Sequence, residues 1–307
     1  MRTRTLGRTG IEVSVLGFGC SPLGGVFGEI DEAEGIRAVA LALKEGIRYF
    51  DVAPFYGHTR AEAVLGRALA GVPREAYVLS TKVGRYGETE FDFSAHRVKQ
   101  SLAESLSRLR VQYADIVLVH DVEFGSLEQV VEETLPALRE AKQQGIARAI
   151  GISGLPLASL HWIVERAEVD VILSYCHLNL NDTALVSLLP LLSERGIGVI
   201  HAAPLGMGLL TRAGPPPWHP APEPIRAACR AAVELAAEHG RDLAEVALRF
   251  CVGHGGADTT LVGMRSTAEV RANLTALGKP LDPALLQAIA TVLDPIRDLT
   301  WPSGRQG

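Results

Sequence analysis

Cysteine is scarce in this chain, with four residues in 307, and no two of them form a Cys-x-x-Cys pair. They are scattered along the sequence, at Cys20, Cys176, Cys229 and Cys251. This spacing excludes a disulfide framework and a zinc finger, and it indicates buried thiols in a reducing compartment. The His-x-His and His-Glu-x-x-His pairs that seat a catalytic metal are also absent, so we expect no metal site.

Long apolar runs and clusters of basic residues are missing as well. No stretch reaches about 18 apolar residues, and no apolar segment follows the N-terminus as in a signal peptide. The chain carries 30 Lys and Arg against 35 Asp and Glu, a formal charge of −5, and so offers no footprint for nucleic-acid phosphates. We therefore expect a cytoplasmic protein that binds neither membrane nor nucleic acid.

Short runs of β-type residues are abundant, and a helical pattern follows each of them. Most are apolar at successive positions, which indicates parallel strands covered by helices on both faces. The eight runs are Val13–Gly19, Ile47–Val52, Tyr77–Lys82, Asp115–His120, Ala147–Ser153, Val169–Tyr175, Gly198–Ala203 and Thr259–Val262. Eight such units in a chain of this length favour an α/β fold, a (β/α)8 TIM barrel that forms a single domain over residues 1–307.

Helix boundaries are marked by short local signals. Capping boxes begin at Asp31, Thr59, Ser126 and Ser266, and Pro190 predicts a kink or break in a helix over 185–192.

A Rossmann interpretation of Gly17-Phe18-Gly19 fails, because Pro22 stands where the third glycine is needed. We expect a long loop over about 204–224 and a C-terminal tail over about 294–307 to cover the active-site face.

Three consecutive predicted strands end in residues that carry chemistry. Asp51, Lys82 and His120 close the second, third and fourth strands, and Tyr56 follows Asp51 in the next loop. In a barrel the carboxyl ends of the strands converge on one site, so these four side chains should be neighbours. One strand-end residue of this kind is usually structural, but four on adjacent strands indicate a functional cluster.

Together these four groups can move a proton on or off an alcohol or carbonyl oxygen. A phenol titrates near pH 10, and an ammonium ~4 Å away supplies about 4 kcal/mol, enough to lower the pKa of Tyr56 toward ~7. Asp51 would hold Lys82 charged, and His120 would orient the substrate oxygen. The cluster contains no hydride, so a nicotinamide cofactor is implied.

The same residues carry a family resemblance. The opening Leu6-Gly7-Arg8-Thr9-Gly10, the stretch Phe50-Asp51-Val52-Ala53-Pro54-Phe55-Tyr56-Gly57, and the strand-end Lys82 and His120 resemble the aldo-keto reductases over nearly the whole chain. The resemblance implies a single barrel, Asp51, Tyr56, Lys82 and His120 as catalytic residues with Tyr56 as general acid/base, and NAD or NADP across the C-terminal rim.

The resemblance also implies a set of cofactor contacts. Ser153 and Ser174 would hold the nicotinamide, and the 203–208 segment would approach the pyrophosphate. Gly263 and Arg265 belong to a clamp for the adenosine phosphate, and Asn273 would contact adenine. The full set is Ser153, Ser174, Ala203, Leu205, Gly206, Gly208, Gly263, Arg265, Glu269 and Asn273. The family pattern is broken at Gly154, Ser174 and Ala202.

Glu269 bears on the choice of coenzyme. It stands where NADP-preferring relatives often carry Arg or Gln, and a carboxylate there would repel a ribose 2′-phosphate. Glu269 is also the fourth residue of the Ser266 capping box, and Arg265 nearby acts in the opposite sense. We expect NAD as cofactor, with NADP as the alternative.

For the substrate, the resemblance is to family members that oxidise an aldose at C1 to its lactone. L-galactose, L-fucose and D-arabinose share the relevant ring stereochemistry. Glu123, Trp218, His219 and Trp301 would line the sugar site, although both tryptophans could equally be loop anchors.

Three other functions stay open at this point. One is an aldehyde or ketone reductase that uses NADPH. A second is a barrel lyase that forms a Schiff base through Lys82, which would leave Asp51 and Tyr56 without a task. A third is a nucleotide-binding barrel without turnover, since fold alone does not exclude it.

Overall fold

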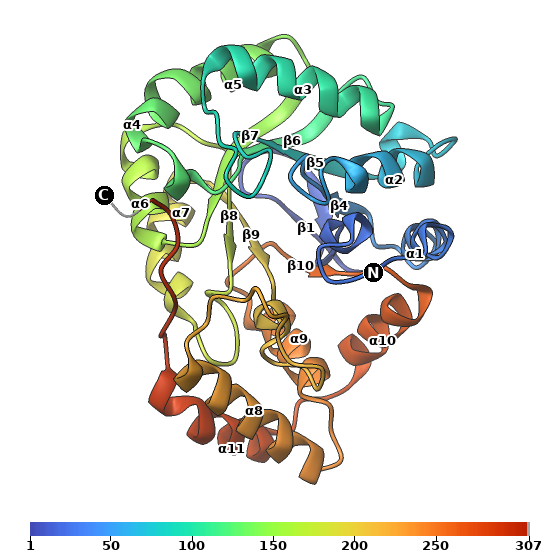
Figure 1. Cartoon of the computed structure of the whole chain (residues 1–307), viewed down its shortest axis with the longest axis vertical. Coiled ribbons are helices and arrows are strands. Elements are labelled where there is room, and N and C mark those ends of the chain that lie inside the picture. The colour runs from blue at the N-terminus through green and yellow to red at the C-terminus, as the bar shows by residue number, and fades with distance from the viewer. Residues whose placement is uncertain (306–307) are drawn as a thin grey trace.

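The computed structural model describes residues 1–305, and Gln306 and Gly307 lie outside the described residues. Eight parallel strands form a closed barrel, in which β10 pairs with both β9 and β3 (Figure 1). They are β3 (Leu16–Gly19), β4 (Tyr49–Asp51), β5 (Val78–Val83), β6 (Ala114–Val119), β7 (Ala147–Gly154), β8 (Val171–Tyr175), β9 (Gly198–Ala202) and β10 (Thr259–Gly263). The (β/α)8 barrel predicted from the sequence is confirmed.

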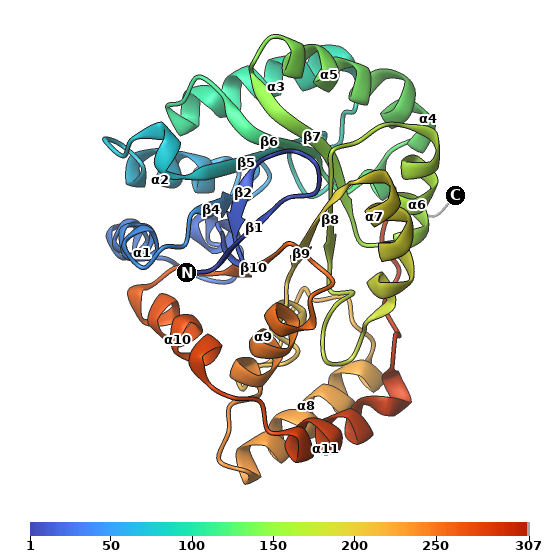
Figure 2. The same ribbon diagram turned by 180° about the vertical axis from the view of Figure 1, so that it is seen from behind.

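Helices surround the barrel on its outer side (Figure 2). They are α1 (Glu32–Lys44), α2 (Arg60–Ala68), α3 (Ala95–Leu109), α4 (Leu127–Gln129), α5 (Leu135–Gln143), α6 (Leu157–Arg166), α7 (Leu189–Arg195), α8 (Glu223–Glu238), α9 (Leu243–His254), α10 (Thr267–Gly278) and α11 (Pro283–Leu293). Helices α8 and α11 pack against each other at the lower edge of Figure 1, outside the repeating βα pattern.

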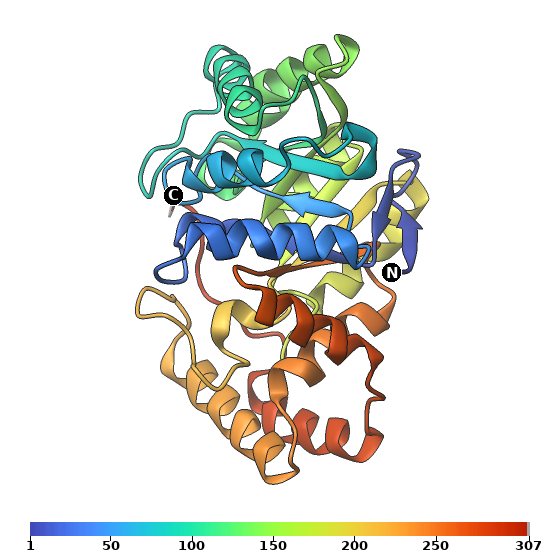
Figure 3. The same ribbon diagram turned by 90° about the vertical axis from the view of Figure 1, so that its right-hand side faces the viewer.

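The N-terminal end of the barrel is closed by a hairpin that the sequence did not indicate. The segment Val13–Gly19, predicted as a single strand, belongs to two strands. Its first residues pair within the hairpin, and its last residues pair within the barrel. Strand β2 (Glu12–Ser14) pairs with β1 (Thr3–Thr5), and the barrel strand begins only at Leu16. Leu6, Ile11 and Val13 of the hairpin are buried against the barrel interior. Figure 3 shows the hairpin on the right-hand side, beside the N-terminus.

Most of the predicted helix boundaries are confirmed. The side chains of Asp31, Ser126 and Ser266 accept hydrogen bonds from the first turns of α1, α4 and α10. Thr59 precedes α2 but makes no such bond, because its backbone is left-handed (φ 72°). The predicted break at Pro190 is present: a 3-10 helix over Ala184–Leu188 gives way to α7, with the proline in its first turn.

Three further observations concern the described residues. All four cysteines are buried and unpaired. Within residues 1–305, no helix has both the length and the apolar character needed to cross a bilayer. No cluster of three or more His, Cys, Asp or Glu side chains in that range could hold a metal ion.

Candidate active site

The four catalytic candidates come together at the carboxyl ends of β4, β5 and β6, which are neighbours in the barrel. Asp51 is the last residue of β4, Lys82 lies near the end of β5, and His120 directly follows β6. Tyr56 lies in the turn after β4. Asp51, Lys82 and His120 are all at least nine-tenths buried. The juxtaposition predicted from strand order is therefore present.

The ammonium group of Lys82 is the centre of the cluster. It donates to Asp51 Oδ1 at 2.5 Å, to the carbonyl oxygen of Val52 at 3.1 Å and to Tyr56 Oη at 3.1 Å. Burial alone would lower the pKa of Lys82, but the charge of Asp51 and the contact with Tyr56 outweigh it and raise that pKa. A buried ammonium with three acceptors stays charged, and it has no hydrogen left to spare.

Asp51 is held by a second chain of hydrogen bonds on its other side. Ser80 Oγ donates to Asp51 Oδ2 at 2.6 Å, and Tyr49 Oη lies 3.0 Å from the same serine oxygen. Both carboxylate oxygens of Asp51 are thus engaged within the barrel. The carboxylate is oriented toward Lys82, so its role is to fix the ammonium.

The pKa of Tyr56 differs from the value expected near 7. Burial of the phenol raises its pKa to about 12, because desolvation outweighs the lowering by Lys82, and Asp51 raises it further. The expected direction of the Lys82 effect was right, but the net shift was wrong. Tyr56 is therefore a neutral phenol at physiological pH, hydrogen-bonded to a cation that stabilises its ionised form.

His120 lies against Tyr56 as a neutral imidazole. The two rings are 5.5 Å apart and nearly perpendicular, at 88°. Burial, followed by the charges of Lys82 and Arg85, holds the pKa of His120 well below its usual value. A neutral imidazole can still donate one N–H hydrogen bond to a ligand oxygen.

Sequence reasoning missed two charged residues beside His120. Asp121 Oδ2 lies 3.7 Å from His120 Nε2, and Arg85 Nη1 pairs with the same oxygen at 2.5 Å. The Arg85 guanidinium lies 3.7 Å from the centre of the Phe55 ring. The one sequence signal for Asp121 was its position directly after the strand-end His120. Nothing in the sequence indicates that Asp121 pairs with Arg85.

The two residues predicted to hold the nicotinamide, Ser153 in β7 and Ser174 in β8, lie in different surroundings. Ser153 is buried; its hydroxyl donates to the carbonyl of Val119 and accepts from the N–H of Asp121. Ser174 lies on the helix side of β8, because its neighbour Tyr175 faces the barrel interior. Tyr175 was not anticipated, and the placement of Ser174 does not support its predicted role.

Glu123 occupies the space above Gly154. A Cβ atom at Gly154 would come within 2.6 Å of Glu123 Oε2, so the glycine makes room for the carboxyl group. Glu123 Oε1 accepts from the N–H of Leu155 and from Ser303 Oγ, whereas Oε2 is buried with no hydrogen-bond partner among the described residues. Burial raises the pKa of Glu123 to about 7.

The segment after β9 bends sharply. Ala203, Gly206, Met207 and Gly208 all have positive φ angles, of 56°, 57°, 51° and 104°, and Leu205 lies between them. Gly208 has no room for a side chain, because a Cβ atom there would lie 2.9 Å from the carbonyl oxygen of Gly214. At Gly206 this bent backbone carries no side chain, which lets a ligand approach it closely at the barrel rim.

The start of α10, which follows Gly263 at the end of β10, is already lined with carboxylates. Glu269 Oε2 accepts from the N–H of Arg265 at 2.7 Å. Glu34 of α1 accepts from both the N–H and the hydroxyl of Thr267, at 2.7 and 2.6 Å, and these bonds lower its pKa to about 2. Asn273 lies one turn beyond Glu269 on the same helix face. Glu34 was not anticipated.

Two of the predicted sugar-site residues hold loops together. The ring nitrogens of His219 are both used, since Nδ1 accepts from the N–H of Ala221 and Nε2 contacts the carbonyl of Gly206. Burial lowers the pKa of His219 to about 4. Trp301 is buried edge-on against His219, with ring centres 4.7 Å apart. Neither ring nitrogen of His219 is left for a sugar hydroxyl, so its contacts do not support the predicted role, which stays a prediction for both residues.

Trp218 is different, because it is 51 % exposed and packs against Phe27. The C-terminal tail contacts Glu123 through Ser303 and through the N–H of Arg305, which donates to the Glu123 carbonyl. The tail therefore lies directly beside the residues that follow β6.

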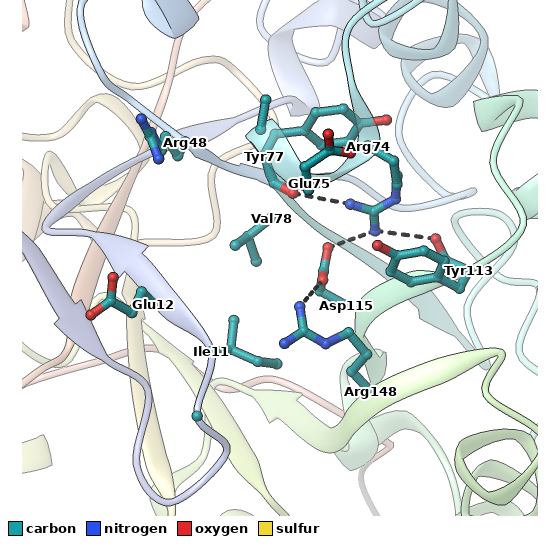
Figure 4. A pocket seen from close by; sticks show the side chains of 12 residues that line it. Ile11, Glu12, Arg48, Arg74, Glu75, Tyr77, Val78, Tyr113, Asp115 and Arg148 are labelled. Carbon is teal, nitrogen blue, oxygen red and sulfur yellow. Dashed lines mark hydrogen bonds and ion pairs between the residues drawn. The ribbon is translucent and has the colours of Figure 1, made fainter.

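A hollow at the other end of the barrel contains no candidate catalytic residue. It lies between the hairpin and the first residues of β5 and β6 (Figure 4). Arg74 and Arg148 both point at Asp115, at 2.6 and 2.7 Å, and the carboxylate also accepts from the N–H of Leu79. With its charge matched on both sides, Asp115 ties the strand starts together.

Comparison with known proteins agrees with this geometry. Residues 15–294 match the model of the aldo/keto reductase family, so the chain belongs to that family. It is an NAD(P)-dependent oxidoreductase. The chain is 46 % identical to an L-galactose dehydrogenase of Arabidopsis thaliana, over 98 % of this chain and 97 % of that protein.

Two other relatives are informative. The chain is 32 % identical to a D-arabinose 1-dehydrogenase of Saccharomyces cerevisiae, over 78 % of this chain and 76 % of that protein. The solved aldo-keto reductase AKR11C1 from Bacillus halodurans, in its holo form, superposes with a TM-score of 0.81 at 29 % identity, covering both chains fully.

Proposed function

We propose that this protein oxidises an aldose at its C1 hydroxyl to the corresponding lactone, with NAD as hydride acceptor. The observation that carries the proposal is the 3.1 Å contact between Lys82 Nζ and Tyr56 Oη at a rim that also presents a neutral histidine. The two relatives named above as sugar dehydrogenases support an aldose of the L-galactose, L-fucose or D-arabinose type.

Tyr56 is the proton-transferring group in this proposal. In the oxidation its phenolate accepts the proton of the C1 hydroxyl; in the reverse direction the neutral phenol donates it. Lys82 stabilises the phenolate through its hydrogen bond, and Asp51 keeps the ammonium aimed at Tyr56. His120 donates its N–H to the reacting oxygen and orients it. When bound, the nicotinamide supplies or takes up the hydride.

The residues at the rim fit a dinucleotide. The bent backbone of 203–208 leaves room for a close approach. Glu123 Oε2, a buried acceptor without a partner among the described residues, is instead suited to a sugar hydroxyl. We expect the cofactor to be held by residues at or after the carboxyl ends of β7, β9 and β10, namely Ser153, Gly206, Gly208, Gly263 and Asn273.

Preference for NAD over NADP rests on the start of α10. Two carboxylates, Glu34 and Glu269, already accept the N–H groups of Thr267 and Arg265. A ribose 2′-phosphate placed there would find these donors occupied and would meet two negative charges. Arg265 is itself engaged with the carbonyl of Phe27 and with Glu269, which limits its use as a phosphate ligand.

The alternatives are weaker on specific grounds. A Schiff base needs a neutral Lys82, but the pKa of this lysine is raised and its hydrogens are all engaged. A binding protein without turnover would not need a phenol paired with a buried ammonium. A carbonyl reductase uses the same groups in the reverse direction, and the carboxylates at α10 argue against NADPH as its donor.

One assay tests the proposal. Purified protein is incubated with a panel of aldoses and with NAD or NADP, and reduced nicotinamide is followed by its absorbance. We expect turnover of L-galactose, L-fucose or D-arabinose with NAD, with lactone as product. Activity restricted to aldehyde reduction with NADPH would contradict the proposal.

A further inference from the structure

The surroundings of His120 are asymmetric. Its Nδ1 atom is buried and has no hydrogen-bond partner among the described residues. Its Nε2 atom lies on the side of Asp121, 3.7 Å from Oδ2. Only Nε2 is therefore placed to serve a ligand, and only Nε2 has a negative charge beside it.

We propose that Asp121, held by Arg85, is a positioning residue that fixes the proton of neutral His120 on Nε2. A neutral imidazole carries one proton, and the neighbour of each nitrogen decides which one holds it. A proton on Nδ1 would be buried without an acceptor, and it would leave the Nε2 lone pair facing a carboxylate. Both effects favour the Nε2–H form.

The backbone of Asp121 is shaped for this role. Its φ of 49° and ψ of 61° lie in the left-handed region, which only glycine, asparagine and aspartate adopt readily. Its N–H donates to Ser153 Oγ at 3.3 Å, so the end of β7 helps to hold this conformation. This strained backbone conformation lies directly after His120, at the candidate active site. Backbone strain is often found at such sites, where it serves function.

Arg85 completes the arrangement by balancing the charge. Its guanidinium pairs with Asp121 at 2.5 Å and lies over Phe55, with the Phe91 and Phe124 rings at 5.3 and 5.4 Å. A free carboxylate next to His120 would favour the imidazolium. Because Arg85 matches that charge, and Lys82 adds a further cation, Asp121 selects a tautomer while the ring stays neutral.

This inference rests on the proposed function only for its catalytic meaning, because the tautomer is measured without turnover. Nitrogen-15 NMR of the wild-type protein, with His120 assigned through His120→Gln, reports the protonation of each ring nitrogen. We expect His120 to show a protonated Nε2 and a bare Nδ1 between pH 6 and 8. A proton on Nδ1, or a doubly protonated ring, would overturn the proposal.

A double-mutant cycle tests whether Asp121 acts through His120. Asp121→Asn keeps the size and the left-handed tendency but removes the charge, and we expect kcat for aldose oxidation to fall about tenfold or more. In a His120→Gln background the same change should have little further effect. Glu128→Gln, which removes an exposed carboxylate in α4, is the matched control and should leave kcat unchanged.

Two outcomes would reject the role of Asp121 and leave the proposed function intact. An equal loss in both backgrounds would mean that Asp121 acts on the substrate directly. Full activity of Asp121→Asn would mean that it has no part in catalysis. Arg85→Met adds an independent readout, because an unbalanced Asp121 should raise the pKa of His120 and protonate the ring at a higher pH in the NMR titration.

Discussion

At the scale of single residues, the chemistry depends on a competition at the Tyr56 hydroxyl. Lys82, 3.1 Å away, stabilises the phenolate, while burial and the negative charge of Asp51 destabilise it. Burial wins, and the pKa of Tyr56 rises to about 12. The site is therefore set to donate a proton at neutral pH, and oxidation requires the minor, ionised form.

This competition predicts how the rate of oxidation depends on pH. Because the phenolate is the reactive form and its fraction grows with pH, kcat/KM for aldose oxidation should rise about tenfold per pH unit above neutrality. Reduction of the lactone or of a model carbonyl should be nearly flat over the same range. Steady-state rates between pH 6 and 10 in both directions check this, and a flat oxidation profile would contradict it.

The cluster itself was predictable from the sequence, but its energetics were not. Asp51, Lys82 and His120 end three consecutive apolar runs, and strand order alone makes such residues neighbours. The net pKa of Tyr56 depends on how much water the fold removes, which no spacing reveals. Asp121 and Arg85 were missed because their pairing depends on a left-handed backbone turn.

At the scale of elements, the start of α10 shows how one helix terminus combines structure and specificity. Ser266 caps the helix, as its sequence indicated, and Glu269 reaches back to the N–H of Arg265. The second carboxylate comes from Glu34 in α1, more than 230 residues away in sequence. A contact of that kind follows from barrel closure, which brings α1 beside α10.

Coenzyme preference should respond to both carboxylates. Glu269→Arg should strengthen NADP binding about tenfold or more, because a repulsive charge is replaced by a phosphate ligand. Glu34→Gln should act in the same direction with a smaller effect, since it removes a negative charge and releases Arg37 from its ion pair but introduces no new cation. Dissociation constants for NAD and NADP, measured by quenching of protein fluorescence, give the comparison.

The control for this pair is Glu32→Gln. Glu32 is a partly exposed acidic residue in the first turn of α1, and its side chain pairs with Arg67. This substitution changes the charge of the same helix by the same amount, and it should leave both dissociation constants unchanged. If neither Glu34→Gln nor Glu269→Arg changes the dissociation constant for NADP, the two carboxylates do not determine which coenzyme is preferred.

At the scale of the whole molecule, the barrel was the most predictable feature, because eight buried strands in series leave few other arrangements. The hairpin β1–β2 was missed, since the single apolar run over 13–19 hides the change of pairing partner at Val15. The pair α8 and α11 was also missed, because it lies outside the βα repeat that the periodicity follows.

The stability of the folded chain should depend on pH through Glu123. Its pKa is about 7 in the folded protein and near 4.5 when exposed, so the folded state binds more protons between these values. Unfolding free energy should therefore fall as pH rises from about 4.5 to 7, by about 3 kcal/mol from this group. In denaturant unfolding of Glu123→Gln, the unfolding free energy should lack this part of its dependence on pH.

The comparison is made between wild type and Glu123→Gln at each pH, which removes the contribution of all other groups. The unfolding free energy of Glu123→Gln, relative to that of the wild type, should increase as pH rises to 7 and stay constant above pH 7. A constant difference from pH 4 to 8 would show that the Glu123 carboxyl has the same pKa in both states.

Tyr56→Phe tests whether the Tyr56 hydroxyl transfers the proton. Removing the hydroxyl deletes the proton-transferring atom and leaves the aromatic ring in place. We expect kcat for aldose oxidation with NAD to fall by about a hundredfold or more while the dissociation constant for NAD stays the same. Near-native turnover in Tyr56→Phe would contradict it.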